Sequence, residues 1–408
     1  MRKTVLALVF LILCASLFAA GATEDGPYTG VTDNAFRPTT VNVRDRLNYS
    51  LFVNASGLAK GGLAVELPYL ESSSYNIAGA VKDRSVAEAL SRITKFQADR
   101  NDWIVYVLGL VMASGTGYSD VFTSDIGTGA IIGNFAFGFN LKAGIQAMPP
   151  IVDGETGQAS SPAGNGYVPQ VNYAFSFAYG RRIVDTDRLT LDIGGAVRFA
   201  EKVYLHQLTL SVLTSVLWNP EGINYLPARG GFAVPLDLGV TLGILDGMLE
   251  FSAMADNLNG VYYMKDYANY KDALLFRDGN NDDENMPALV YTPFSLSLAA
   301  KFNPRWDYVD PTVYLEFTGI NRYLETVSDR QYGFLEMLRY IDAGLNLNLF
   351  SLFDLRANYR YGYPEFGVVF DAFGNMVELS YGFKEAGEEY GLKPVDHLTV
   401  RMRLGYSR

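Results

Sequence analysis

Few residues of this chain have the types and spacing that enzymatic or metal chemistry needs. His206 and His397 are its two histidines and lie far apart in the sequence, and Cys14 is its single cysteine. A zinc site, or a nucleophile activated by a histidine, needs several such side chains within reach of one another. The G-x-S-x-G motif of a nucleophilic serine is also missing from the sequence. We therefore predict no enzymatic activity, no metal site and no cofactor.

An acidic segment over residues 278–284 resembles the start of a calcium-binding loop. Such loops need a glycine at the sixth position, which is Asp283 here. They also end on a bidentate glutamate at the twelfth position, where this chain has Leu289. We interpret the segment as a solvated loop.

The charge balance excludes one class of partner. The chain carries 44 Asp and Glu against 33 Lys and Arg, for a formal net charge of −11. Proteins that bind nucleic acid normally present positive charge to the phosphates. We therefore expect no nucleic-acid partner.

The first 22 residues have the parts of a signal peptide. Two basic residues precede an apolar run over residues 5–13, and Ala20 and Ala22 provide the small-x-small cleavage pattern. A lipoprotein signal ending at Cys14 is the alternative, but the bulky Leu13 before the cysteine disfavours it. We predict a signal peptide over residues 1–22 and export of the chain.

The composition then indicates how an exported chain of this kind meets a membrane. Hydrophobic residues make up 49% of the chain, which includes 27 Tyr and 25 Phe. After the signal peptide, no segment offers the roughly 18 uninterrupted apolar residues of a transmembrane helix. Since only helices and closed barrels satisfy their backbone hydrogen bonds within a bilayer, a membrane barrel is the natural candidate.

A period of two residues recurs along the chain. In the segment 341–349, for example, Leu345 and Leu347 alternate with Asn346 and Asn348. The same alternation is found in the segments 135–145, 189–199, 232–244, 353–363 and 398–406. A half-buried sheet of a soluble sandwich also alternates, but its strands are usually shorter than these. We therefore predict an all-β fold, a transmembrane antiparallel β-barrel over residues 62–408.

The spacing of these segments predicts fourteen strands, with twelve as the alternative. The first three are expected at residues 62–69, 73–82 and 130–147. With both termini in the periplasm, the long connections all fall on the outer side and the tight turns on the inner side, as in known barrels. These long connections are 148–169, 204–231, 259–289, 320–337 and 386–395.

Two segments do not fit a bare barrel. Residues 23–61 are polar and irregular, and we interpret them as an N-terminal plug segment. Residues 83–128 contain helical signals, among them a capping box formed by Ser85 and Glu88. The strand count places this small helical insertion on the periplasmic side, where it covers the lumen or forms a cap without a gating role.

The connection 204–231 is unusually apolar for a segment that faces water. Exposed apolar patches often mark a ligand or partner site. The candidate substrate-binding residues are Leu208, Leu213, Val216, Leu217 and Trp218. The alternatives are that the outer loops fold over one another, or that residues 206–218 extend a strand.

Two short stretches resemble the FadL-type outer-membrane transporters of long-chain fatty acids and other hydrophobic compounds. In the stretch 51–59, Asn54 is followed by Ala55 where the family has an Asn-Pro-Ala sequence, and the stretch 251–260 resembles strands of that superfamily. The resemblance implies a plug, capture of cargo at the outer loops, and lateral release near a kinked third strand. It points to Asn54 for the plug and to Gly133 and Gly138 for the opening at the third strand.

The expected function is passive uptake of hydrophobic small molecules, such as long-chain fatty acids, across the bacterial outer membrane. The alternative is a non-transport surface barrel with a structural, adhesive or secretion-associated role, followed by a polar porin. Expected partners are outer-membrane lipid, a hydrophobic ligand such as a fatty acid, and the barrel-insertion machinery, which would recognise Tyr406 near the C-terminus.

Overall fold

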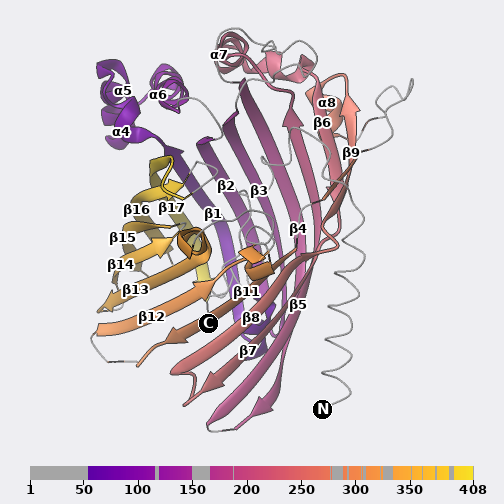
Figure 1. Ribbon diagram of the computed structural model, residues 1–408, viewed down its shortest axis with the longest axis vertical. Coiled ribbons are helices and arrows are strands. Elements are labelled where there is room, and N and C mark those ends of the chain that lie inside the picture. Colours follow the sequence, from indigo (N-terminus) through magenta and orange to yellow (C-terminus); the bar gives the residue numbers. More distant parts are fainter. Residues whose placement is uncertain are drawn as a thin grey trace.

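The computed structural model describes most of the chain from residue 54 onward. The described residues are 54–114, 119–148, 166–186, 188–275, 277, 288–291, 294–304, 306, 309–321, 323–324, 334–350, 352–360, 362–372, 375–385 and 390–407. The predicted signal peptide (1–22), residues 23–53 of the predicted plug and the acidic segment 278–284 lie outside them. The described residues form a closed antiparallel β-barrel (Figure 1).

Seventeen strand segments make up the wall. In chain order they are β1 (Leu63–Tyr75), β2 (Ser119–Ile132), β3 (Phe135–Met148), β4 (Gly166–Asp185), β5 (Leu189–Leu205), β6 (Ala228–Ala233), β7 (Leu236–Ile244), β8 (Leu249–Leu258), β9 (Val261–Tyr267), β10 (Ala288–Tyr291), β11 (Ser295–Phe302), β12 (Val309–Phe317), β13 (Ile341–Leu349), β14 (Phe353–Arg360), β15 (Tyr363–Ala372), β16 (Asn375–Glu385) and β17 (Pro394–Ser407).

Three positions in the wall are each shared by two consecutive segments. β6 and β7 both pair with β5, and β9 and β8 pair with β6 and β7 in turn. β10 and β11 then pair with β9 and β8, and β17 closes the ring on β1. The seventeen segments therefore make a barrel of fourteen strands, which confirms the predicted number.

The predicted two-residue alternation is present in the strands. In β13, Asn346 and Asn348 are each 6% exposed and point inward, whereas Leu345 is 38% exposed on the outer face. The outer faces of the other strands carry exposed Phe, Leu, Ile and Val in the same phase. The barrel thus has a polar interior and an apolar exterior, as a membrane requires.

The first strands differ from the prediction. β1 is one strand where two were expected, at 62–69 and 73–82, and its register shifts between Glu66 and Tyr69 against both neighbours. Pro68, which has no backbone N–H for the ladder, lies within this irregularity. The strand that the prediction missed is β2, which pairs with β1 from Phe122 to Ile132 and with β3 along its whole length.

This change moves the helices between β1 and β2 to the other end of the barrel. They are α4 (Ile77–Ala80), α5 (Arg84–Thr94) and α6 (Arg100–Ala113). Because the chain crosses the wall once before them, and not twice, they lie at the end of the long connections (Figure 1). The prediction that the insertion 83–128 lies at the end of the tight turns is therefore wrong.

Two long connections carry the other helices at this end. α7 (Leu210–Trp218) and the short 3-10 helix η2 (Pro220–Tyr225) join β5 to β6, and α8 (Tyr270–Leu274) follows β9. A further 3-10 helix, η3 (Phe334–Tyr340), precedes β13. None of the helices in the described residues is long and apolar enough to cross a membrane.

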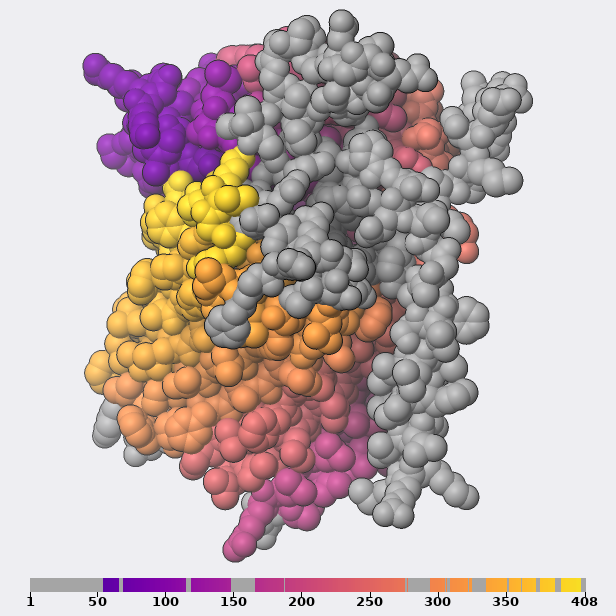
Figure 2. Space-filling view, in the orientation of Figure 1, coloured from indigo at the N-terminus to yellow at the C-terminus, as the bar shows by residue number. Residues whose placement is uncertain are grey.

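The helices α4 to α8 and η2 pack on the outer side of the barrel rim, and we call them the helical collar. In β4 the outward side chains change from exposed at Phe175 (50%) to buried at Tyr167 (5%) as the strand reaches the collar. In β5 the outward Val203 and Leu205 are fully buried in the same way. These residues form one apolar cluster with Leu110 of α6, so the collar covers strand ends on the membrane side (Figure 2 shows α4–α6 in indigo and purple).

Candidate functional site in the barrel lumen

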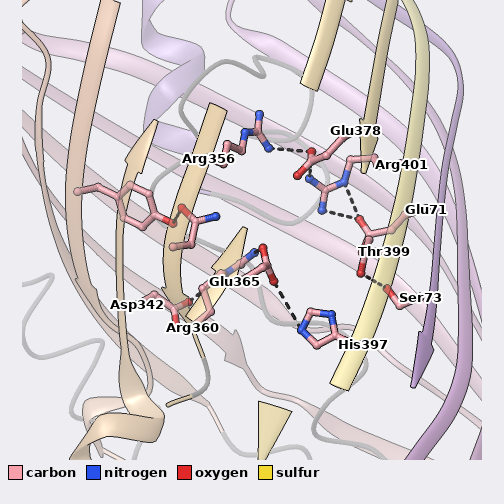
Figure 3. A network of polar contacts seen from close by, with 12 residues as sticks. Glu71, Ser73, Asp342, Arg356, Arg360, Glu365, Glu378, His397, Thr399 and Arg401 are labelled. Atoms are coloured by element: carbon pink, nitrogen blue, oxygen red, sulfur yellow. Dashed lines mark hydrogen bonds and ion pairs between the residues drawn. The ribbon is translucent and has the colours of Figure 1, made fainter. Parts of the chain in front are cut away.

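The first feature of the lumen is a wall of paired charges on β14, β16, β17 and β1 (Figure 3), which we call the charged wall. Arg401 lies at its centre and contacts two carboxylates. Its Nη2 is 2.7 Å from Glu71 Oε2, and its Nη1 is 2.8 Å from Glu378 Oε2. Arg356 Nη1 reaches the same Glu378 oxygen at 2.7 Å. Each charge in this row is thus neutralised by a neighbour on the next strands.

A second group of charges lies next to the first. His397 Nε2 is 3.6 Å from Glu365 Oε2, and the guanidinium of Arg360 is 3.9 Å from the other oxygen of that carboxylate. Arg360 also lies 3.7 Å from Asp342. His397 is 5% exposed, and its contact is with a carboxylate that already faces an arginine. His397 therefore joins the ion pairs between neighbouring strands on this side of the lumen.

The second feature is an apolar cluster on the inward side of the opposite wall. Its members come from β4, β5, β6 and β9 and are all 9% exposed or less. They are Val168, Ala174, Ala200, Tyr204, Ala233, Tyr262 and Met264, which we call the inner apolar wall. Lys202 borders it, with Nζ 4.5 Å from the centre of the Tyr262 ring. An apolar surface inside the lumen differs from the polar lining that such barrels generally have.

The third feature is a row of glycines that seats the segment before β1. Gly180, Gly194 and Gly239 are register partners across β4, β5 and β7, all on the inward side. A Cβ atom at Gly180 or Gly194 would come within 2.5 Å of the backbone of Ala55. Ala55 begins the 3-10 helix η1 (Ala55–Lys60), so this helix packs directly on the backbone of the wall.

Asn54, the residue before η1, fixes the segment to the wall. Its side-chain Nδ2 donates to the backbone oxygens of Val240 and Ala253, both at 3.3 Å, and its Oδ1 accepts from Ser56 N. Asn54 is 1% exposed, and its Oδ1 would be 1.7 Å from a Cβ atom on Gly239. The segment 54–60 therefore occupies the lumen at the end of the tight turns. These residues belong to the segment 23–61, whose role as a plug, with Asn54 as a plug residue, stays a prediction.

The two glycines expected at a lateral opening have other surroundings. Gly133 lies in the turn between β2 and β3, with φ +61°, and its N–H donates to Gly62 O at 2.8 Å. Gly138 lies within β3, whose register runs without a shift along β4 and past this residue along β2. Their role in a lateral opening stays a prediction. Such an opening would require the hydrogen bonds between β3 and its neighbours, which are continuous here, to separate.

The candidate capture residues lie in the helical collar. Leu208 and Leu213 are 7% and 1% exposed in its apolar cluster, and Leu217 packs against the same cluster. Val216 is partly buried, and Trp218 is 49% exposed at the end of α7. Such packing corresponds to the alternative interpretation, in which the long connections fold over one another. Whether these residues contact a ligand stays a prediction.

Sequence reasoning missed the inner apolar wall and the glycine row. Both depend on register between strands, which places Gly180 beside Gly194 and Gly194 beside Gly239. One signal was available, because Tyr262 and Met264 alternate within the connection assigned as 259–289 and could have marked β9 as a strand.

Comparison with known proteins gives likeness in overall structure alone. No family model matches the sequence, and no curated protein matches it. The chain is similar to the solved Pseudomonas putida toluene transporter TodX, with 12% identity, coverage of 91% of this chain and 96% of that one, and a TM-score of 0.43.

Two further solved structures are similar to a comparable degree. The Ralstonia pickettii toluene transporter TbuX has 11% identity, coverage of 95% and 99%, and a TM-score of 0.39. A Pseudomonas aeruginosa FadL homologue has 8% identity, coverage of 94% and 98%, and a TM-score of 0.39. Two toluene transporters and a FadL homologue are thus among the solved structures to which this chain is similar. Likeness at this level does not decide the substrate, which has to be argued from the residues.

Proposed function

We propose that this protein is an outer-membrane barrel for the passive uptake of hydrophobic small molecules, with long-chain fatty acids as the first cargo to test. The inner apolar wall is the observation that carries the proposal. Its seven side chains face the lumen, at the end of the barrel that bears the long connections. A channel for polar solutes gains nothing from apolar area in its lumen, whereas an acyl chain gains about 0.8 kcal/mol per methylene that it buries.

The arrangement of the lumen supports the same proposal. In the charged wall each arginine faces a carboxylate, and these pairs brace the barrel. The inner apolar wall is then the surface that we assign to cargo, which has to part the contacts that bury its side chains. At the other end of the lumen the segment 54–60 fills space along the inside of β4, β5 and β7. Cargo that enters from the long-connection side therefore meets the apolar wall before it meets the seated segment.

A titration of the purified protein with fatty acids of increasing chain length tests the proposal. We expect the affinity to rise with chain length and to fall when Tyr262 and Met264 are both replaced by Gln. The control is Arg356→Gln in the charged wall, which should leave the affinity unchanged. An affinity independent of chain length, or a double variant that binds as the parent does, would rule the proposal out.

A polar porin is the second candidate, because the charged wall offers a polar surface along part of the lumen. Conductance of the protein in planar lipid bilayers separates the two. A porin gives steady ohmic steps with simple salts, whereas a barrel for hydrophobic cargo with a seated N-terminal segment gives little conductance. Asn54→Ala removes the hydrogen bonds that hold the segment 54–60 against the barrel wall. It should raise the conductance only if this segment blocks the lumen.

A further inference from the structure

We propose that the helical collar lies in the outer leaflet of the membrane, with the free face of α6 in contact with lipid chains and headgroups. The proposal concerns a surface outside the lumen and does not depend on what the barrel transports. It rests on the composition of α6, on which of its faces the protein covers, and on what adjoins the uncovered face.

α6 is apolar on all sides. After Arg100, Asn101 and Asp102 at its start, every residue from 103 to 113 is apolar or glycine. A helix of this kind is normally covered on every side, either by protein or by membrane. With 14 residues it is about 21 Å long, which is too short to cross a bilayer. It can, however, lie along the membrane surface.

The protein covers one side of α6. Ile104, Tyr106, Leu110 and Val111 are 5% exposed or less and pack toward the barrel and α5. The contact with the barrel includes a hydrogen bond of 3.5 Å from the Tyr167 hydroxyl of β4 to Val111 O. This side of the helix accounts for roughly half of its apolar surface.

The other side of α6 carries a stripe at helical spacing that the protein leaves partly open. Its members are Val105, Leu108 and Met112, three and four residues apart, and Met112 is 68% exposed. Phe96, in the connection between α5 and α6, is 98% exposed. Apolar side chains in this number on a water-facing surface need a cover.

Lipid is the cover that the surroundings of α6 favour. The outward row of β4 runs from Tyr179, Phe177 and Phe175, which are exposed by 43 to 53%, up to Tyr167 beneath the collar. The collar thus continues the lipid-facing surface of the barrel. Exposed basic residues flank it, and they match the anionic headgroups at the surface of the leaflet. They are Lys82, Arg84, Lys95 and Arg100.

Tryptophan fluorescence in reconstituted vesicles tests the proposal. The chain has three tryptophans, which are replaced by Phe to give a background without them. Met112→Trp in this background is then placed in phosphatidylcholine–phosphatidylglycerol vesicles that contain lipid brominated near the headgroup end of its chains. We expect the bromine to remove most of the emission, while iodide in the water has little effect.

Two matched variants serve as references for contact with lipid and contact with water. Phe177→Trp, on the outer face of β4, reports full contact with lipid, and Glu88→Trp, on the polar side of α5, reports contact with water. Each variant is first checked for the mobility shift of a folded barrel, and Leu108→Trp, in the same stripe, serves if Met112→Trp does not fold. Quenching of the α6 probe by iodide and not by bromolipid would overturn the proposal in favour of a water-facing surface. Quenching by neither, together with the mass of a dimer or complex, would overturn it in favour of a protein partner.

Discussion

The two walls of the lumen face each other within one barrel and differ in what they can contact. On the charged wall, Arg356, Glu378, Arg401 and Glu71 are each held by a neighbour, so the surface is complete without a ligand. On the opposite wall the inward side chains include the seven of the inner apolar wall and the glycines of the row, together with polar residues such as Arg198 and Asp237. That wall meets η1 at its glycine row and offers apolar area at its other end.

The strands that bear the two walls also differ in length. β4 and β5 of the apolar wall have 20 and 17 residues, against 8, 11, 14 and 13 for β14, β16, β17 and β1 of the charged wall. The longer strands rise beyond the shorter side and carry the apolar wall to the collar (Figure 1). The comparison shows that inward-facing residues on different strands of the same barrel have different surroundings. Paired charges make up the charged wall on one side, whereas the other side combines the Arg198–Asp237 pair with apolar residues and glycines.

The charged wall should be the more sensitive to loss of a single charge. Arg401→Met would leave Glu71 and Glu378 facing each other without their shared cation. We expect a loss of about 3 kcal/mol in the free energy of unfolding, at the lower end of the range for a broken buried pair because the lumen admits some water. Arg84→Met, at a side chain 91% exposed, should cost well under about 1 kcal/mol. Urea unfolding in vesicles measures both, and equal losses would contradict the comparison.

The comparison also requires that the charges face inward and the apolar residues outward. Leu345→Arg, on the outer face of β13, should cost about 2–4 kcal/mol if it meets the bilayer near its middle. Leu352→Arg, at the turn between β13 and β14, should cost about 0–1 kcal/mol because it lies near the membrane surface. The same unfolding measurement applies. A turn variant that is destabilised as much as the strand variant would place the membrane differently.

The glycine row should tolerate no side chain where it seats η1. Gly194→Ala places a Cβ 2.2 Å from the carbonyl carbon of Ala55, so the segment must move. We expect about 1–3 kcal/mol of destabilisation, as for other overpacked sites, and faster trypsin cleavage after Lys60. Gly127→Ala is the control, since its Cβ would have ordinary contacts of 3.4 Å or more. Unchanged cleavage of the Gly194 variant would mean that the seat is not occupied in the membrane.

The smallest expected difference concerns two buried serines, one near each wall. The Ser73 hydroxyl is 2.8 Å from the Thr399 hydroxyl beside the charged wall, so Ser73→Ala should cost about 1 kcal/mol. Ser176 of β4 is 0% exposed, and its hydroxyl has no hydrogen-bond partner. Ser176→Ala should therefore be neutral or slightly stabilising. Equal losses at the two positions, seen by the same unfolding assay, would show that the walls do not differ in this respect.

The sequence by itself determined the class of fold, the number of strands and the phase of most of them. Alternation is a property of neighbouring residues, so Asn346 and Asn348 could be assigned to the lumen and Leu345 to the outer face without a structure. The role of the polar segment before the barrel, and of Asn54 within it, stays a prediction. The expected roles of Leu208, Leu213, Gly133 and Gly138 stay predictions.

Only the tertiary structure decided what depends on register and closure. The division of β1 into two predicted strands put the helices at the wrong end of the barrel, and only the pairing of β1 with β2 and β17 corrects this. The inner apolar wall joins residues as far apart as Val168 and Met264, and the glycine row joins Gly180 to Gly239. Hydrogen bonds between strands bring such residues together, and a pattern read along one strand does not contain them.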